Sequence, residues 1–99
     1  MYEVKYAEDV SKDLKELTAF KRKEILDRIH QELLNEPTRE TRNKKVLADA
    51  EPPWPFKEPL RELRVGDYRV FYDVDLDASQ VVVRAIRHKP PHKTTKEIL

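Results

Sequence analysis

The stretch from Leu63 to Asp75, LRVGDYRVFYDVD, decides the fold of this 99-residue chain. Two segments with alternating apolar residues flank Gly66-Asp67, and this glycine is the only one in the protein. A two-residue Gly-Asp link between such segments predicts a β-hairpin with a type II′ turn. The turn fixes which residues of the two strands lie opposite each other.

The predicted register places two arginines against each other. Arg64 lies directly across from Arg69, and like charges that face each other across strands destabilise a hairpin by up to about 1 kcal/mol. An anion-binding role would explain the pair, because guanidinium groups match phosphate oxygens with two hydrogen bonds. The alternative is that both side chains extend into water, or that Glu62 and Asp73 on the same face neutralise them.

Composition predicts one folded domain spanning residues 1–99. The chain has 38% hydrophobic and 39% charged residues, and its apolar positions follow regular periods. Net charge is only +1, so an electrostatic function depends on where the charges lie. The C-terminal region is basic and has no carboxylate between residues 84 and 96, where it carries Arg84, Arg87, His88, Lys89, His92, Lys93 and Lys96.

Several classes of function are excluded or disfavoured. The chain contains no cysteine, so disulfides and thiolate chemistry are excluded. Lys89-Pro90-Pro91 separates His88 from His92 and prevents the helix that would align them as ligands, so no metal is predicted. Loops that bind nucleotide cofactors need several glycines and the chain has one, so no cofactor is predicted. No segment approaches the ~20 apolar residues that span a bilayer, and the N-terminus lacks the apolar core of a signal peptide. We therefore expect a soluble cytoplasmic protein without a membrane partner.

Periodicity predicts the remaining elements. Residues 2–6 alternate as a strand does, a short amphipathic helix begins at about residue 8, and a second helix follows Thr18 and ends at about Asn35. Residues 36–59 contain five prolines and predict an ordered loop, in which Trp54 and Phe56 cover one end of the core. Strands are expected at about 60–65, 68–74 and 80–87, and residues 94–99 are compatible with a helical turn.

This order predicts an α+β domain in which the helices pack on one face of a mostly antiparallel sheet that ends in a three-strand meander. If Val81, Val83 and Ala85 face the helices, alternation sends a mainly polar group to the open face: Glu62, Arg64, Arg69, Phe71, Arg84 and His88. Val82 and Ile86 would share that face. Part of the face must then be covered, or the strand register must shift by one residue.

The order of elements, the motif YRVFY at residues 68–72 and the basic run RAIRHK at residues 84–89 resemble the RelE/ParE superfamily of type II toxins. Residues 43–47 are similar to the basic stretch that precedes the second strand in these toxins. RelE members cleave messenger RNA on the ribosome, whereas ParE members poison DNA gyrase. The resemblance implies a RelE-like fold and a cognate antitoxin that wraps around the toxin.

The resemblance further implies a metal-free ribonuclease in which the ribose 2′-hydroxyl attacks the adjacent phosphate. Such chemistry needs a base, an acid and cations that stabilise the phosphorane. Arg69 matches the arginine of the family's Tyr-Arg motif and is expected to hold the phosphate together with Arg64. His88 suits acid or base chemistry near neutral pH, and Glu62 is the second candidate base. Further RNA-binding residues are expected among the remaining basic groups, namely Arg84, Lys89, His92, Lys93, Lys44 and Lys45.

The late catalytic tyrosine of RNA-cleaving toxins has no counterpart here. His92, Lys93 or Lys89 would have to supply the acid, or the chain is a member that acts by binding alone. The leading hypothesis is a ribosome-dependent endoribonuclease with the ribosome, messenger RNA and an antitoxin as partners. The alternative is a gyrase-directed or otherwise non-nucleolytic toxin, and a non-toxic nucleic-acid-binding protein is a third hypothesis.

Overall fold

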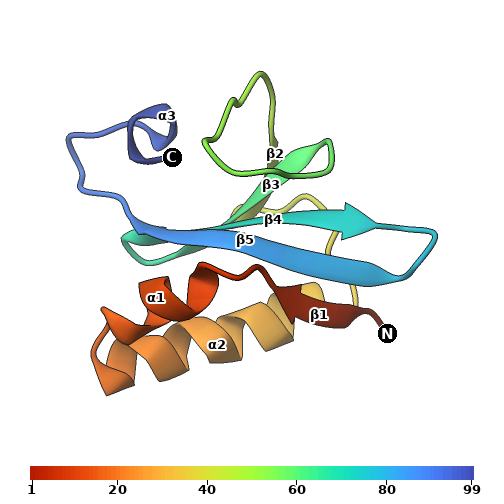
Figure 1. Cartoon of the computed structure of the whole chain (residues 1–99), viewed down its shortest axis with the longest axis horizontal. Helices are drawn as coiled ribbons and strands as arrows, with labels where there is room; N and C mark the ends of the chain where they lie inside the picture. Colours follow the sequence, from red (N-terminus) through yellow and green to blue (C-terminus); the bar gives the residue numbers. More distant parts are fainter.

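Five strands form one sheet with the order β1-β5-β4-β3-β2 in the computed structural model, which describes residues 1–99 (Figure 1). β1 pairs in parallel with β5, and the other neighbours are antiparallel. The predicted α+β architecture, with an N-terminal strand, two helices and an antiparallel meander, is confirmed. The elements are β1 (Glu3–Tyr6), α1 (Val10–Lys15), α2 (Ala19–Leu33), β2 (Lys44–Leu47), β3 (Leu60–Val65), β4 (Tyr68–Asp75), β5 (Gln80–His88) and α3 (Thr95–Ile98).

The β3–β4 hairpin has the predicted register. Leu63 pairs with Val70, and Arg64 pairs with Arg69. Gly66 has a φ of +59°, which the first central position of a type II′ turn requires and which residues with a side chain rarely adopt. The turn therefore brings the two arginines to the same rung of the sheet.

α1 and α2 cover one face of the sheet, and the main core lies beneath them (Figure 1). α2 begins after Thr18, whose hydroxyl accepts a hydrogen bond from the Lys21 backbone N–H at 3.1 Å. No helix combines the length and the apolar composition that crossing a membrane requires. The main core contains Val10, Ile25, Ile29, Leu33, Leu63, Val65, Val70, Tyr72, Val74, Val81, Val83 and Ile86.

The opposite face of the sheet is covered in part by the segment between β2 and β3 and by α3 (Figure 1). Leu60, Phe71 and Ala85 form a second, small apolar cluster there. Trp54 and Phe56 pack against this cluster, and the Trp54 ring lies 5.8 Å from the Phe71 ring. Their covering role is confirmed, although they cover this cluster and not the main core.

The prediction of a continuous loop over residues 36–59 is wrong for Lys44–Leu47, which form the edge strand β2. Four residues are too few for a clear alternating pattern, and the two lysines at the start obscure it. The outer edge of β2 is protected, because the Val46 N–H donates to the Glu40 carboxylate at 3.2 Å.

A β-bulge in β5 interrupts the alternation of the last strand. Phe71 pairs with Ala85 and Tyr72 pairs with Val83, so Arg84 has no partner on β4. An extra residue of this kind reverses the faces to which all later residues of the strand point.

Because of the bulge, the faces predicted for Ala85 and His88 in β5 are wrong. Ala85 was expected against the helices but packs with Phe71 on the other face, whereas Ile86 enters the main core. His88 was expected on the open face but lies beside Tyr68 on the helix side, with the two rings 5.1 Å apart. The register shift that the sequence left open thus occurs within the last strand.

Candidate functional site

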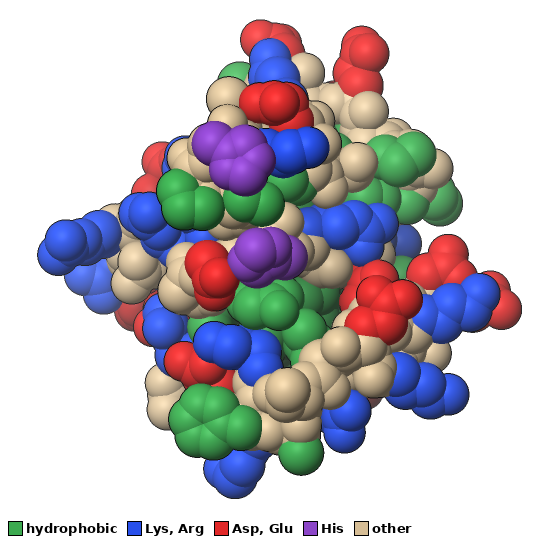
Figure 2. Space-filling model, turned by 90° about the vertical axis from the view of Figure 1, so that its left-hand side faces the viewer, with side chains coloured by type: hydrophobic (Ala, Val, Ile, Leu, Met, Phe, Trp, Pro, Cys, Tyr) green, Lys and Arg blue, Asp and Glu red, His purple; other side chains and the backbone are tan.

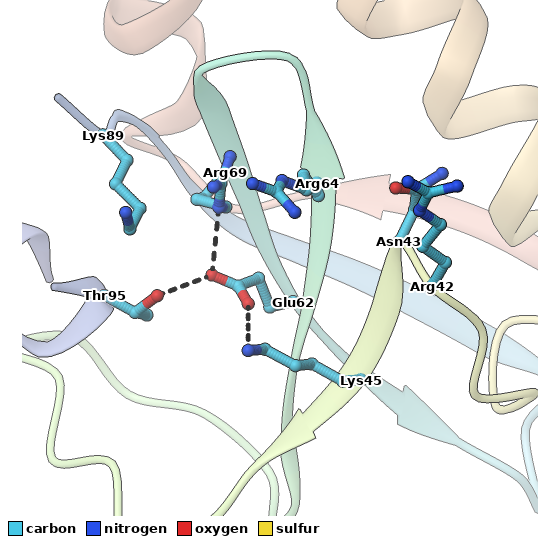
Figure 3. Close-up of a pocket in the computed structure, with 8 residues that line it drawn as sticks. All are labelled: Arg42, Asn43, Lys45, Glu62, Arg64, Arg69, Lys89 and Thr95. Atoms are coloured by element: carbon cyan, nitrogen blue, oxygen red, sulfur yellow. Dashed lines mark hydrogen bonds and ion pairs between the residues drawn. The ribbon is translucent and has the colours of Figure 1, made fainter. Parts of the chain in front are cut away.

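A charged pocket of about 220 Å³ lies between the β3–β4 hairpin, the start of β2 and the C-terminal segment (Figure 3). No hydrophobic residue lines this charged pocket. Five basic side chains surround one carboxylate, so the pocket has an excess of positive charge and is suited to an anion. The lining residues are Arg42, Asn43, Lys45, Glu62, Arg64, Arg69, Lys89 and Thr95.

Glu62 on β3 connects three walls of the charged pocket, as the dashed lines in Figure 3 show. Its Oε1 accepts a hydrogen bond from Thr95 Oγ1 at 3.0 Å and lies 3.5 Å from Arg69 Nε. Its Oε2 lies 3.7 Å from Lys45 Nζ. The side chain is only 4% exposed, and burying a carboxylate is costly unless it has such partners.

Arg69 on β4 is held mainly by the hairpin itself. Its Nη1 donates to the backbone oxygens of Gly66 at 2.9 Å and Tyr68 at 2.8 Å. Burial lowers the pKa of Arg69, the charge of Glu62 opposes this effect, and the charge of Arg64 adds to it. The guanidinium is therefore a fixed, partly desolvated cation at the floor of the charged pocket.

Arg64 and Lys89 complete the positive lining. The Arg64 side chain is exposed, and its guanidinium lies beside that of Arg69 (Figure 3). Lys89 follows β5 and extends its side chain toward the pocket, and its backbone N–H donates to the Asp67 carbonyl at 2.7 Å. The ion pairs within the pocket join Glu62 to Lys45 and Arg69, so the charges of Arg64 and Lys89 are left for an external anion.

Sequence reasoning missed Arg42, Asn43 and Thr95 as lining residues. Asn43 is the first residue of the basic stretch at residues 43–47 and Arg42 precedes it, so this part of the chain carried a usable signal. The Asn43 carbonyl accepts the Arg64 backbone N–H at 2.7 Å, which ties this stretch to β3. Nothing in the sequence indicated Thr95, because only the packing of α3 brings it near Glu62.

Lys44 does not reach the charged pocket. It alternates with Lys45 along β2 and points to the opposite face, where it is buried. Its Nζ donates to the carbonyls of Glu32 at 3.0 Å and Glu36 at 2.8 Å, near the end of α2. The expected contact of Lys44 with RNA is incompatible with this position.

Arg84 also lies outside the charged pocket. Its guanidinium contacts both carboxylate oxygens of Asp73, at 2.6 Å and 3.3 Å. Asp73 is buried and also accepts the backbone N–H of Lys57 at 3.0 Å. Arg84 therefore serves to neutralise a buried carboxylate at the bulge.

The bulge places His88 outside the charged pocket, although Lys89 next to it lines that pocket. His88 Nε2 lies 2.8 Å from the Asp67 carboxylate, and this hydrogen bond lowers the pKa of Asp67. His92 and Lys93 are exposed in the segment before α3 and do not line the pocket either. Figure 2 shows the hairpin end of the molecule, where histidine side chains lie at the surface among acidic and basic groups.

The sequence matches the family described as the ParE toxin of the type II toxin-antitoxin system, parDE, over residues 4–89. The match spans most of the chain, so the chain belongs to this family and is a type II toxin of the RelE/ParE superfamily. A search of curated protein sequences found no match.

Solved structures of RelE toxins have the same fold. A chain of the archaeal RelE-RelB complex from Pyrococcus horikoshii is 24% identical, with a TM-score of 0.70 and coverage of 94% of this chain and 98% of that chain. A chain of the RelBE2 complex from Mycobacterium tuberculosis is 23% identical, with a TM-score of 0.69 and coverage of 89% and 98%. The isolated E. coli RelE toxin is 17% identical, with a TM-score of 0.66 and coverage of 98% and 94%. At this level of identity the likeness establishes the RelE-like fold alone.

Proposed function

We propose that this type II toxin is a ribosome-dependent endoribonuclease that cleaves messenger RNA in the charged pocket. The observation that carries the proposal is the set of five basic groups around Glu62, with no hydrophobic residue in the lining. Guanidinium and ammonium groups in such an arrangement bind phosphate oxygens. A sugar-phosphate linkage is the part of RNA that matches this chemistry.

The proposed reaction is a metal-free transesterification. Glu62 takes the proton from the ribose 2′-hydroxyl, and the 2′-oxygen forms a bond to the adjacent phosphorus. Arg64 and Arg69 stabilise the negative charge that develops on the phosphate oxygens. The bond from phosphorus to the 5′-oxygen breaks, and the Lys89 ammonium donates a proton to that oxygen. The products are a 2′,3′-cyclic phosphate and a 5′-hydroxyl.

The composition of the charged pocket supports the proposed dependence on the ribosome. Single-stranded RNA is usually bound through stacking of bases on aromatic side chains, and none lines this pocket. The pocket contacts the backbone only, so another surface has to orient the RNA strand. The decoding site of the ribosome supplies that surface in this proposal, which implies action in the cytoplasm.

The test is expression of the wild type, Arg64→Ala and Lys89→Ala in a bacterial host, with mapping of RNA ends. Lys15→Ala is the matched control, because Lys15 is an exposed basic residue on α1, far from the hairpin in sequence. We expect growth arrest and ribosome-dependent cuts for the wild type and the control, and a loss of cuts by at least tenfold in both pocket variants. Equal cutting by all four proteins contradicts the proposal.

A toxin that acts by binding alone, such as a gyrase inhibitor, is the second candidate. The observations that favour it are the 4% exposure of Glu62, which restricts access to the proposed base, and the ParE description of the matching family. The same cultures distinguish the two functions. Gyrase-linked DNA breaks without RNA cuts support the second candidate and refute the first.

We also propose that this chain binds a cognate antitoxin, because proteins of similar fold occur in RelE-RelB toxin-antitoxin complexes. The basic residues after the bulge are complementary to an acidic, amphipathic antitoxin segment. If they dominate the interface, affinity falls as salt is added. Isothermal titration at two salt concentrations measures this dependence.

A further inference from the structure

We infer that Thr95, from the C-terminal helix α3, is a positioning residue that keeps the Arg69 guanidinium available to a bound phosphate. The inference rests on the proposed function of the charged pocket. Thr95 is the only lining residue that α3 contributes, and its hydroxyl points at Glu62 (Figure 3).

The distances around Glu62 show which contact is closest. Thr95 Oγ1 lies 3.0 Å from Oε1, whereas Arg69 Nε lies 3.5 Å from the same oxygen and Lys45 Nζ lies 3.7 Å from Oε2. Hydrogen bonds between charged nitrogen and oxygen groups are ordinarily about 2.7–2.9 Å long. Both cations therefore lie farther from the Glu62 carboxylate than in an ordinary charged hydrogen bond. The neutral Thr95 hydroxyl makes the shortest of the three contacts with this carboxylate.

The hydroxyl satisfies the carboxylate without bringing in a positive charge. The Glu62 and Arg69 side chains are only 4% and 7% exposed, so water competes weakly for them. Without the hydroxyl, Oε1 is free to close on Arg69 Nε, because opposite charges attract strongly in a desolvated site. A close pair of this kind neutralises Arg69 and weakens its attraction for phosphate.

The position of Thr95 is fixed from both sides. The Thr94 backbone N–H before it donates to the Glu97 carboxylate at 2.9 Å. Ile98 and Leu99 after it pack against the small apolar cluster on the sheet. The contact with Glu62 is therefore built into the way α3 docks on the sheet.

The test is a titration of the purified full chain with inorganic phosphate, followed through the Nε–H NMR signals of Arg64 and Arg69. The variants are Thr95→Val, which keeps the shape and removes the hydroxyl, and Thr95→Ser, which restores it. Thr38→Val is the matched control, because Thr38 lies outside the charged pocket. We expect phosphate to bind roughly tenfold more weakly to Thr95→Val, and within about twofold of wild type to Thr95→Ser and Thr38→Val.

Each outcome decides between the inference and the proposed function. Equal weakening by valine and serine shows that Thr95 acts through packing, which overturns the inference. Wild-type affinity in Thr95→Val overturns the inference alone and leaves the anion pocket intact. A wild type in which phosphate shifts neither arginine signal overturns the pocket as an anion site. Thr95→Ala, which removes the hydroxyl without a branched side chain, replaces Thr95→Val if valine displaces α3.

Discussion

One face of the sheet is stabilised by apolar packing, whereas the other carries most of the charged groups of the candidate site. The face under α1 and α2 carries a continuous apolar core in which most side chains are fully buried. The opposite face is divided between a cluster of three buried apolar residues and the charged pocket. The first face supplies the stability that allows the second to keep two like charges, the buried Arg69 and the exposed Arg64, close together. Truncation of a side chain on the first face should therefore mainly lower the free energy of unfolding, whereas truncation in the charged pocket should mainly change ligand binding.

The largest effect on stability is expected from Ile29→Ala on α2. Ile29 is fully buried in the main core, and its truncation leaves a cavity that costs about 2–5 kcal/mol of unfolding free energy. Phe20→Ala on the same helix is the control, because Phe20 is 80% exposed and should change stability by less than about 0.5 kcal/mol. Urea unfolding measures both values, and equal values would contradict the assignment of the core to this face.

A smaller loss of stability and a gain in RNA affinity are expected from Glu62→Gln. The change removes the counter-charge of the buried Arg69 and costs about 2 kcal/mol. The charged pocket then holds no carboxylate, so a non-cleavable RNA binds more tightly at low salt. Urea unfolding and fluorescence anisotropy measure the two effects, and weaker RNA binding would show that the pocket does not bind the phosphate backbone. Cleavage is nevertheless expected to stop, because the proposed base is lost.

An intermediate effect that depends on pH is expected from Tyr72→Phe in the main core. The Tyr72 hydroxyl donates to the Pro37 carbonyl at 2.8 Å, so its loss costs about 1 kcal/mol at pH 7. Burial raises the pKa of Tyr72 above its ordinary value of about 10.

The sign of the pH effect follows from which state loses the proton first. Above pH 10 the unfolded chain releases the Tyr72 proton while the folded protein retains it, so wild-type stability falls as pH rises, by at most about 1.4 kcal/mol per pH unit. Tyr72→Phe lacks this contribution, so its stability and that of the wild type should converge between pH 10 and 11. Urea unfolding at several pH values measures this, and a constant difference would indicate that the hydroxyl is accessible in the folded state.

The smallest effects on stability are expected from Lys89→Ala and His88→Ala, which compare neighbours on opposite faces. Both residues are partly or fully exposed, and each change should cost less than about 0.5 kcal/mol. Lys89→Ala should weaken RNA binding and reduce the slope of log affinity against log salt by about 1, whereas His88→Ala should leave both unchanged. Anisotropy titrations at several salt concentrations distinguish them, and equal losses would argue against the bulge as the determinant of the site.

Local patterns were sufficient for the hairpin and for the order of most elements. Gly66 specified the turn, and the turn specified the pairing of Arg64 with Arg69. The apolar spacing of α2 and the hydroxyl of Thr18 identified that helix and its start. These features depend on residues close together in the chain, and their physical signals are therefore visible in the sequence.

The composition of the charged pocket depended on contacts that local patterns do not encode. Arg84 at the bulge pairs with Asp73 on the neighbouring strand, and the bulge decides that Lys89 and not His88 lines the pocket. The docking of α3 on the small apolar cluster decides that Thr95 reaches Glu62. The sequence by itself determined the hairpin, the helices and the family, because those signals are local or recur along the chain. Only the tertiary structure decided which other side chains join Arg64 and Arg69 in the pocket, because the register of β5 and the docking of the C-terminal segment arise from contacts between distant residues.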